Sequence, residues 1–291
     1  MRSHLFAVMC LALGMPAVTS AADPRPEAAP APSAAAKPAA VEVVGHRGES
    51  HDAPENTLAS YNLAWSRHDP ACELDVHLTK DGKLIVSHDP DTKRTAGTKV
   101  VIKDATVDEL KKLDVGSWKD PKFAGERLPT LDEALATIPP GGRFFLEVKI
   151  GPEAVPELAK CIERSGRKPE QLPIISFNLE SCRAAKAALP KHPVYFLASF
   201  KQDKATKKWA PTADELIAKA KDAKLDGLDV EAAKSPVVDA AFVKAVRAAG
   251  MGLYTWTIDD PARAKELAAL GVDGITTNRA AWLREQLGAE K

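Results

Sequence analysis

From residue 41 onward the sequence alternates short apolar runs with amphipathic helical patterns, and this alternation limits the possible folds more than any other feature. Runs with the length and residue types of strands lie at 41–45, 72–76, 143–149, 173–176, 194–197, 227–231, 252–257 and 274–276. Helical patterns lie between most of them, at 56–67, 152–164, 179–189, 213–223, 238–249 and 261–270. Such an alternation predicts an α/β fold, a parallel TIM-type (β/α)8 barrel. An open doubly wound sheet is the alternative, but no Gly-x-Gly-x-x-Gly loop follows the first strand.

The alternation breaks once, over residues 89–130. This segment contains Lys93-Arg94-Thr95, a short helical pattern at 107–113 and Gly116-Ser117-Trp118. It is longer than an ordinary connection between a strand and the next element. We therefore predict a small insertion here, a lid or subdomain, within one domain that spans residues 41–288.

The first forty residues differ in composition from the rest of the chain. Two basic residues precede an apolar stretch at 5–18, and small residues end at Ala22, which is typical of a secretory signal at 1–22. Residues 23–40 are mostly Pro and Ala and predict a linker. A membrane anchor is the alternative, although the apolar stretch is short for a spanning helix. We expect a secreted or periplasmic protein with no stable membrane insertion after signal removal.

The charge pattern argues against a nucleic-acid partner. Lys and Arg number 40, Asp and Glu also number 40, and no basic run interleaved with aromatic residues is present. Binding to a phosphate backbone needs a concentrated positive surface, which this sequence lacks.

Cysteine usage gives no metal or redox motif. Cys10 lies in the predicted signal, which leaves Cys72, Cys161 and Cys182, and no Cys-x-x-Cys spacing occurs. We expect the three cysteines to be small buried side chains. The alternative, in an oxidising compartment, is a disulfide between Cys161 and Cys182.

Carboxylates alternate on two of the predicted strands. Glu73 and Asp75 are two residues apart, so both side chains point to one face of their strand. Glu147 and Lys149 repeat this spacing on the next strand of the pattern. Carboxylates buried together repel one another and need a cation, and oxygen ligands suit Mg²⁺ or Ca²⁺. The alternative is a network of ion pairs among Glu73, Glu147, Lys149 and Arg47.

Two histidines and an arginine stand where barrel enzymes carry their chemistry, at the ends of strands. His46 and Arg47 end the first strand, and His88 ends the apolar run at 84–86. An arginine can donate two hydrogen bonds to a phosphate, and two imidazoles can divide the acid and base roles near neutral pH. This equipment suits the metal-assisted cleavage of a phosphodiester.

Five ordered motifs in the chain resemble the glycerophosphodiester phosphodiesterase family. They are Gly45-His46-Arg47-Gly48, Pro54-Glu55-Asn56-Thr57, Glu73-Leu74-Asp75-Val76, Thr79-Lys80-Asp81-Gly82 and Ser87-His88-Asp89. The resemblance covers residues 41 to about 287. It implies a TIM barrel whose insertion lies above the barrel mouth.

The resemblance also implies roles for individual residues. His46 and His88 would be catalytic, and Glu73, Asp75 and Glu147 would hold one divalent ion, Mg²⁺ or Ca²⁺. Arg47 and Lys149 would bind the phosphate. Glu55 would orient groups at the mouth, and Trp256 would lie beside the substrate.

The implied reaction is the metal-dependent hydrolysis of small-molecule glycerophosphodiesters to sn-glycerol 3-phosphate and an alcohol. A hydroxyl of the glycerol would attack phosphorus, and water would then open the cyclic phosphate. Cleavage of lysophospholipids or phosphoinositides on the same barrel is the alternative, and a non-catalytic binding module is a remote one.

Other residues near these motifs lie close to the site without belonging to the sets above. We expect His77 to lie past the end of its strand in solvent, His51 to line the entrance, and Trp118 to be a possible cover of the pocket. Asn56 either orients a neighbouring group or caps the following helix. The chain departs from the family pattern at 69–72, which reads Asp-Pro-Ala-Cys, and at Thr92; both bear on the shape of the substrate pocket.

Overall fold

The eight predicted strands close into a barrel. The structure, a computed structural model, describes residues 41–288. In that part of the chain the barrel strands are β1 Glu42–Gly45, β2 Ala71–Leu78, β4 Arg143–Val148, β5 Ile174–Ser176, β6 Val194–Ala198, β9 Gly227–Glu231, β10 Gly252–Trp256 and β11 Gly274–Thr277. All pairs between neighbours are parallel, and β1 pairs with both β11 and β2, which closes the ring. The TIM-type prediction is confirmed, whereas the predicted signal at 1–22 and linker at 23–40 lie outside the described residues.

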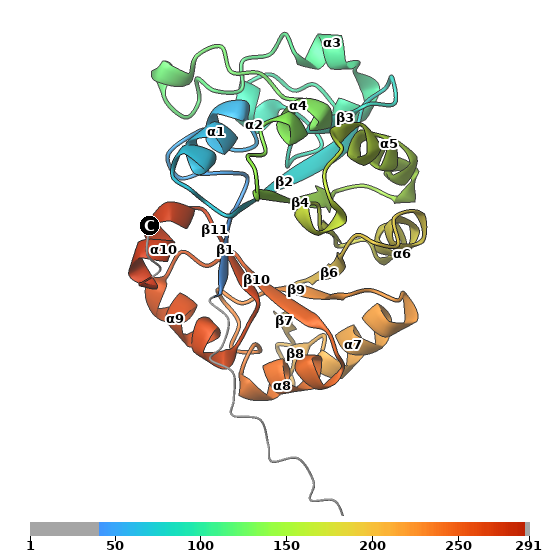
Figure 1. The fold of residues 1–291 in the computed structure, drawn as a ribbon, viewed down its shortest axis with the longest axis vertical. Coiled ribbons are helices and arrows are strands. Elements are labelled where there is room, and N and C mark those ends of the chain that lie inside the picture. The colour runs from blue at the N-terminus through green and yellow to red at the C-terminus, as the bar shows by residue number, and fades with distance from the viewer. Residues whose placement is uncertain (1–40, 289–291) are drawn as a thin grey trace, which may run out of the picture. The chain divides into compact units, whose positions relative to one another are not determined.

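Each barrel strand leads to a helix that packs on the outside of the ring (Figure 1). These helices are α1 Leu58–Ser66, α4 Leu131–Ala136, α5 Val155–Ser165, α6 Leu179–Ala188, α7 Ala213–Asp222, α8 Ala240–Ala248, α9 Pro261–Leu270 and α10 Ala280–Gln286. Local sequence sets their starts: Thr130 and Thr212 each begin a capping box, in which the threonine hydroxyl accepts from the backbone N–H of a glutamate three residues later. Short 3₁₀ turns, η3 Pro152–Ala154 and η4 Pro169–Gln171, and the hairpin β7 Lys201–Gln202 and β8 Trp209–Ala210 complete this layer.

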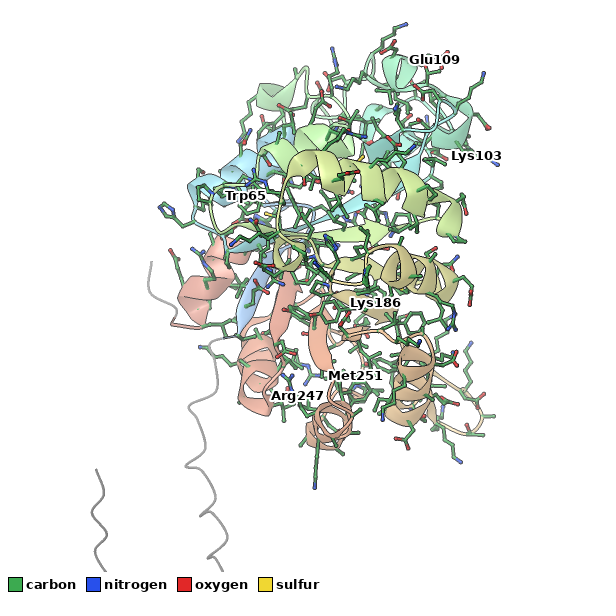
Figure 2. All side chains as sticks on the ribbon, turned by 45° about the vertical axis from the view of Figure 1, so that its right-hand side comes forward. Trp65, Lys103, Glu109, Lys186, Arg247 and Met251 are labelled. Atoms are coloured by element: carbon green, nitrogen blue, oxygen red, sulfur yellow. The ribbon has the colours of Figure 1, made fainter. Side chains whose placement is uncertain are left out.

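The predicted insertion is present between β2 and α4. It begins with β3 Leu84–Val86, which pairs antiparallel with the end of β2, and continues through α2 Lys93–Ala96, η1 Ile102–Asp104, α3 Val107–Leu110 and η2 Pro121–Phe123. A separate apolar cluster that includes Ile85, Ile102 and Leu110 stabilises it. In Figure 2 the insertion residues Lys103 and Glu109 lie at the far end of the barrel domain from Met251 and Arg247.

The interior of the barrel is filled at its N-terminal end. Phe145, Tyr195 and Tyr254 pack together there, with ring centroids 4.9 Å apart for Phe145 and Tyr254 and 5.1 Å apart for Tyr195 and Tyr254. The Tyr254 hydroxyl donates to Glu42, which forms an ion pair with Arg143. These side chains close the bottom of the barrel, so the open space lies at the carboxyl ends of the strands.

The described residues also show the state of the cysteines and the character of the helices. Cys72, Cys161 and Cys182 are buried free thiols, so Cys161 and Cys182 do not form a disulfide. None of the helices within residues 41–288 has the length and apolar character needed to cross a bilayer.

One pair of buried carboxyl groups carries a stability cost. Asp69, which precedes β2, is 4 % exposed, and neither of its carboxyl oxygens has a hydrogen-bond partner among the described residues. Burial, and then the Glu49 carboxylate beside it, raises the pKa of Asp69 to about 8. The folded protein therefore holds a proton between about pH 4 and pH 8 that the unfolded chain has released, and stability falls as pH rises through this range.

We predict that Asp69→Asn removes this dependence, because an amide cannot ionise. The free energy of unfolding of the variant, relative to the natural protein, should rise by about 1–3 kcal/mol between about pH 5 and pH 8. Denaturant unfolding of both proteins at the two pH values measures this difference. A difference that does not change with pH would contradict the assignment.

Candidate active site

The predicted site residues from three neighbouring strands meet in one pocket at the barrel mouth. His46 and Arg47 follow β1, Glu73 and Asp75 lie on β2, and Glu147 ends β4. The pocket has a volume of about 110 Å³, and its lining includes His46, Arg47, Glu73, His88, Glu147, Lys149 and Trp256. Strand alternation explains the grouping: Leu74, Val76, Leu146 and Val148 pack outward in the main core, so the residues between them point inward.

A tight turn after β1 aims the backbone at this pocket. Arg47 and Gly48 both have positive φ, 57° and 80°. A Cβ on Gly48 would lie 2.4 Å from the Ser60 hydroxyl oxygen, so only glycine fits. The turn brings the Arg47 backbone N–H to Glu73 Oε2 at 2.9 Å, and the Ser60 hydroxyl donates to the Arg47 carbonyl.

Glu73, Asp75 and Glu147 form a carboxylate cluster that could hold a metal ion. One oxygen from each lies within 4.8 Å of the others, and all three residues are buried. Burial, and then repulsion from Asp75 and Glu147, raises the pKa of Glu73 well above its usual range. Glu73 Oε1 is buried and has no hydrogen-bond partner in the described part of the chain. An unpartnered oxygen among crowded carboxylates is what a site for a hard divalent cation requires.

Cations from the protein neutralise this cluster only in part. Lys149 Nζ lies 2.7 Å from Glu147 Oε1 and 3.3 Å from Asp75 Oδ1. Arg47 Nε lies 3.2 Å from Asp75 Oδ2, but the same guanidinium also forms an ion pair with Glu55 at 2.8 Å. The alternative of an ion-pair network is therefore realised in part, yet no cationic side chain among residues 41–288 forms an ion pair with Glu73. The residues present fit a divalent ion.

His46 is held in one tautomer. Its Nδ1 lies 2.7 Å from Asn278 Oδ1, and Asn278 Nδ2 donates to Asp259 at 2.7 Å, so the amide oxygen faces the imidazole. The proton of a neutral His46 is therefore on Nδ1, and its Nε2 carries a lone pair. Burial, and then the Arg47 charge, lowers the pKa of His46 to about 4. His46 is neutral at pH 7 and suited to accept a proton.

His88 has the opposite environment. Its Nδ1 lies 2.7 Å from Asp89 Oδ1, and about a third of its side chain is exposed. A carboxylate at this distance orients the imidazole through Nδ1, and its other ring nitrogen, Nε2, can exchange a proton with a substrate.

An arginine from the insertion joins the surroundings of the two histidines. Arg94 on α2 donates to Asp89 through Nε at 2.7 Å and to both oxygens of Glu55 at 2.7 and 2.8 Å. Because Glu55 also binds Arg47, alternating charges run without a break from His88 through Asp89, Arg94 and Glu55 to Arg47. The insertion thereby fixes the orientation of Asp89.

Comparisons with known proteins agree with this arrangement. Residues 46–281 match the Glycerophosphoryl diester phosphodiesterase family. A glycerophosphodiester phosphodiesterase of Caldanaerobacter subterraneus is 33 % identical over 243 residues, which are 81 % of this chain and 93 % of that protein. One from Bacillus subtilis is 30 % identical over 256 residues, 81 % of this chain and 82 % of that protein.

Among solved structures, an Oleispira antarctica phosphodiesterase in complex with its product sn-glycerol 3-phosphate is 28 % identical, with a TM-score of 0.76, and the match covers 86 % of this chain and 97 % of that one. The chain belongs to the glycerophosphoryl diester phosphodiesterase family. It is therefore a phosphoric diester hydrolase. The resemblance that the sequence motifs indicated is confirmed.

Some residues have positions in this family member that differ from the sequence-based expectation. His77 is wrong as a solvated residue: β2 extends to Leu78, and His77 is 6 % exposed with Nε2 3.2 Å from the His88 carbonyl oxygen. Asn56 does not cap α1, because the cap is Thr57. Asn56 Nδ2 instead donates to Asp75 at 2.7 Å, and Tyr61 donates to Asn56 Oδ1.

Two of the weaker candidates do not line the pocket. The His51 side chain is half exposed and its Nδ1 contacts Asp52 at 2.5 Å. The Trp118 indole donates to the Val115 carbonyl within the insertion, so it is not a cover of the pocket.

The hydrogen-bond partners of the two histidines and one side of the pocket were not predicted from the sequence. Asn278 and Asp259 are far from His46 in the sequence and gave no signal, whereas Asp89 directly follows His88. The missed side is formed by Ile175, Phe177, Leu197, Asp229 and Thr276 beside Trp256. Only the alternating pattern of strand 227–231 could have indicated that Asp229 points inward.

We predict that a divalent ion stabilises the enzyme by relieving repulsion in the carboxylate cluster. At a hundredfold excess over Kd, Mg²⁺ or Ca²⁺ should add about 2.7 kcal/mol, which raises Tm by about 5–10 °C. Glu73→Gln should raise the Tm of the metal-free protein and reduce the shift on metal addition, because one repelling charge and one ligand are lost together.

Thermal unfolding with and without each metal measures both effects. Glu163→Gln, a change at an exposed residue on α5, is the matched control and should behave like the natural protein. An unchanged metal-dependent shift in Glu73→Gln would show that the ion does not bind at this cluster.

Proposed function

We propose that the protein hydrolyses glycerophosphodiesters, in a metal-dependent reaction, to sn-glycerol 3-phosphate and an alcohol. The observation that carries the proposal is a pair of imidazoles with different hydrogen-bond partners on the lining of one pocket. His46 Nδ1 faces the amide oxygen of Asn278, so its Nε2 carries a lone pair, and His88 Nδ1 lies against the Asp89 carboxylate. Such a pair can remove a proton from one oxygen and give a proton to another.

In the first step His46 Nε2 takes the proton of a glycerol hydroxyl as that oxygen attacks phosphorus. The bond between phosphorus and the alcohol oxygen breaks, and His88 gives its proton to the leaving oxygen. A cyclic phosphate results. In the second step His88 takes a proton from water and the water oxygen attacks phosphorus. The bond between phosphorus and the glycerol oxygen that attacked in the first step breaks, and His46 returns its proton to that oxygen.

The remaining residues bind and balance charge. Arg47 and Lys149 stabilise the phosphoryl oxygens as negative charge builds on them. Glu55 holds the Arg47 guanidinium in place, and Trp256 forms one side of the pocket. Glu73, Asp75 and Glu147 would hold one ion, either Mg²⁺ or Ca²⁺, which supplies positive charge next to the phosphate.

We also propose that the enzyme acts outside the cytoplasm, in the periplasm or in the medium. This rests on the signal-like pattern of residues 1–22 and on the Pro- and Ala-rich segment at 23–40. The partner is then a small-molecule diester that reaches that compartment.

A specific observation supports a second candidate, cleavage of larger lipids such as lysophospholipids. A groove of about 690 Å³ adjoins the pocket at His88 and Lys149, and its apolar lining comes from Leu78, Val101, Ile102 and Ile150. An acyl chain could lie there. Equal turnover of glycerophosphocholine and lysophosphatidylcholine would favour this candidate, and a strong preference for glycerophosphocholine favours the first.

We predict that the mature protein releases sn-glycerol 3-phosphate from glycerophosphocholine or a related diester, and that a chelator stops the release. Enzymatic detection of the product, with a panel of headgroups and with Mg²⁺ or Ca²⁺ added back, measures this. The absence of metal-dependent release across the whole panel would contradict the proposal and would favour a binding module without activity.

Substitution of either histidine should lower kcat, whereas substitution of a cluster carboxylate should weaken metal binding. We predict that His46→Ala or His88→Ala lowers kcat about 10²- to 10⁴-fold, because each removes a proton-transfer group, while metal affinity is retained. Asp75→Ala should weaken metal binding first. His51→Ala is the matched control and should keep full activity.

Kinetics and calorimetric metal titration of each variant separate the two classes. Full activity in His88→Ala, or normal metal binding with normal turnover in Asp75→Ala, would show that these roles are wrongly assigned.

A further inference from the structure

The catalytic pocket has two chemically different sides. Arg47, Glu73, Glu147 and Lys149 form a charged side, which the proposed reaction uses for the phosphate and the metal ion. The opposite side is apolar and consists mainly of Ile175, Phe177, Leu197 and Trp256. Among the described residues that line this second side, Asp229 alone is ionisable.

Asp229 lies on the inner face of β9, because Leu228 and Val230 on either side of it pack outward into the main core. It is level with Leu197 on β6 and with Tyr254 on β10. This register places it at the height of Tyr254, at the edge of the aromatic cluster that closes the bottom of the barrel. The carboxyl group therefore stands at the floor of the pocket.

One oxygen of the Asp229 carboxyl group has no hydrogen-bond partner among the described residues. This oxygen is Oδ1, and the residue is 2 % exposed. It is not a member of the carboxylate cluster around Glu73. A buried polar atom without a partner is costly, and such atoms in a binding pocket are normally satisfied by a ligand.

The surroundings of Asp229 select the kind of group it would bind. Burial, and then the Glu147 carboxylate, raises the pKa of Asp229 well above its usual range. A carboxyl oxygen in an apolar pocket accepts a hydrogen bond from a hydroxyl group, which brings no charge into that pocket. The Trp256 indole donates to the Asp229 backbone carbonyl at 3.2 Å, so the apolar wall beside the carboxyl group is fixed in place.

The size of the pocket indicates which half of the substrate reaches Asp229. The pocket, at about 110 Å³, is much smaller than the adjoining groove of about 690 Å³, so it suits the smaller half of a diester. The larger groove beyond His88 is open to the other half, and His88 is the group that gives a proton to the leaving alcohol in the proposed reaction. The glycerol half therefore lies in the pocket, and the alcohol half lies toward the groove.

We infer that Asp229 is a specificity-determining residue that binds a hydroxyl group of the substrate's glycerol unit at the floor of the pocket. The inference rests on the proposed function and deepens it. Asp229 distinguishes a polyol phosphate from an alkyl phosphate of the same length. Its role is recognition, and it takes no part in proton transfer.

The test compares the binding of sn-glycerol 3-phosphate with that of n-propyl phosphate, the same three-carbon unit without hydroxyl groups. Calorimetric titration of the metal-loaded protein gives both Kd values without relying on activity. The natural protein should prefer glycerol phosphate. Asp229→Leu should reduce that preference about tenfold or more, because a hydroxyl then meets an apolar surface. Asp229→Asn, which keeps a donor and an acceptor, should retain most of it.

Asp69→Asn, at a second buried aspartate whose oxygens have no hydrogen bond among the described residues and which lies outside the pocket, is the matched control and should leave the preference unchanged. An unchanged preference in Asp229→Leu, with normal folding and metal affinity, overturns the inference. Failure of the proposed function is a different result: the natural protein would then not hydrolyse glycerophosphocholine. Hydrolysis by the natural protein together with an unchanged preference in Asp229→Leu contradicts only the role of Asp229.

Discussion

Glu73, Asp75 and Glu147 bring three carboxylates within 4.8 Å of one another inside the barrel mouth, where little water is present to screen their repulsion. Strand geometry forces this proximity, because alternate residues of β2 and the end of β4 must point inward. Lys149 and Arg47 offset part of the charge, and Glu73 keeps an oxygen with no partner among the described residues. A further cation would relieve the remaining repulsion, and this links the fold to the chemistry.

The groups around the cluster are held in place by contacts that reach across the sequence. Gly48 permits the turn that places His46 and Arg47. Asn278, which is 232 residues later in the sequence, fixes the His46 tautomer. Arg94 in the insertion binds Asp89 and Glu55 together. The insertion is thus part of the active site. Without Arg94, Asp89 would lose the contact that holds it beside His88, even if the barrel remained intact.

Local patterns predicted the parts of the structure that depend on local sequence. The barrel strands, the insertion and the inward alternation of Glu73 with Asp75 all follow from periodicity. Features that depend on distant contacts could not be predicted from local patterns. Asn278 and Asp259 follow β11 and β10, far from His46 in the sequence, and Asp229 lies on β9, so no local pattern places them at the site. His77 was placed in solvent because the pairing of β3 with β2, which extends β2 to Leu78, is not visible from the β2 sequence alone.

The proposed reaction depends on a divalent ion at the carboxylate cluster rather than on an ion-pair network alone. Anomalous diffraction from crystals that contain Ca²⁺ or Mn²⁺ tests this most directly. We expect one ion with an oxygen of Glu73, of Asp75 and of Glu147 at about 2.0–2.6 Å. A cluster without an ion at saturating metal, with its oxygens bound only by Arg47 and Lys149, would contradict the account.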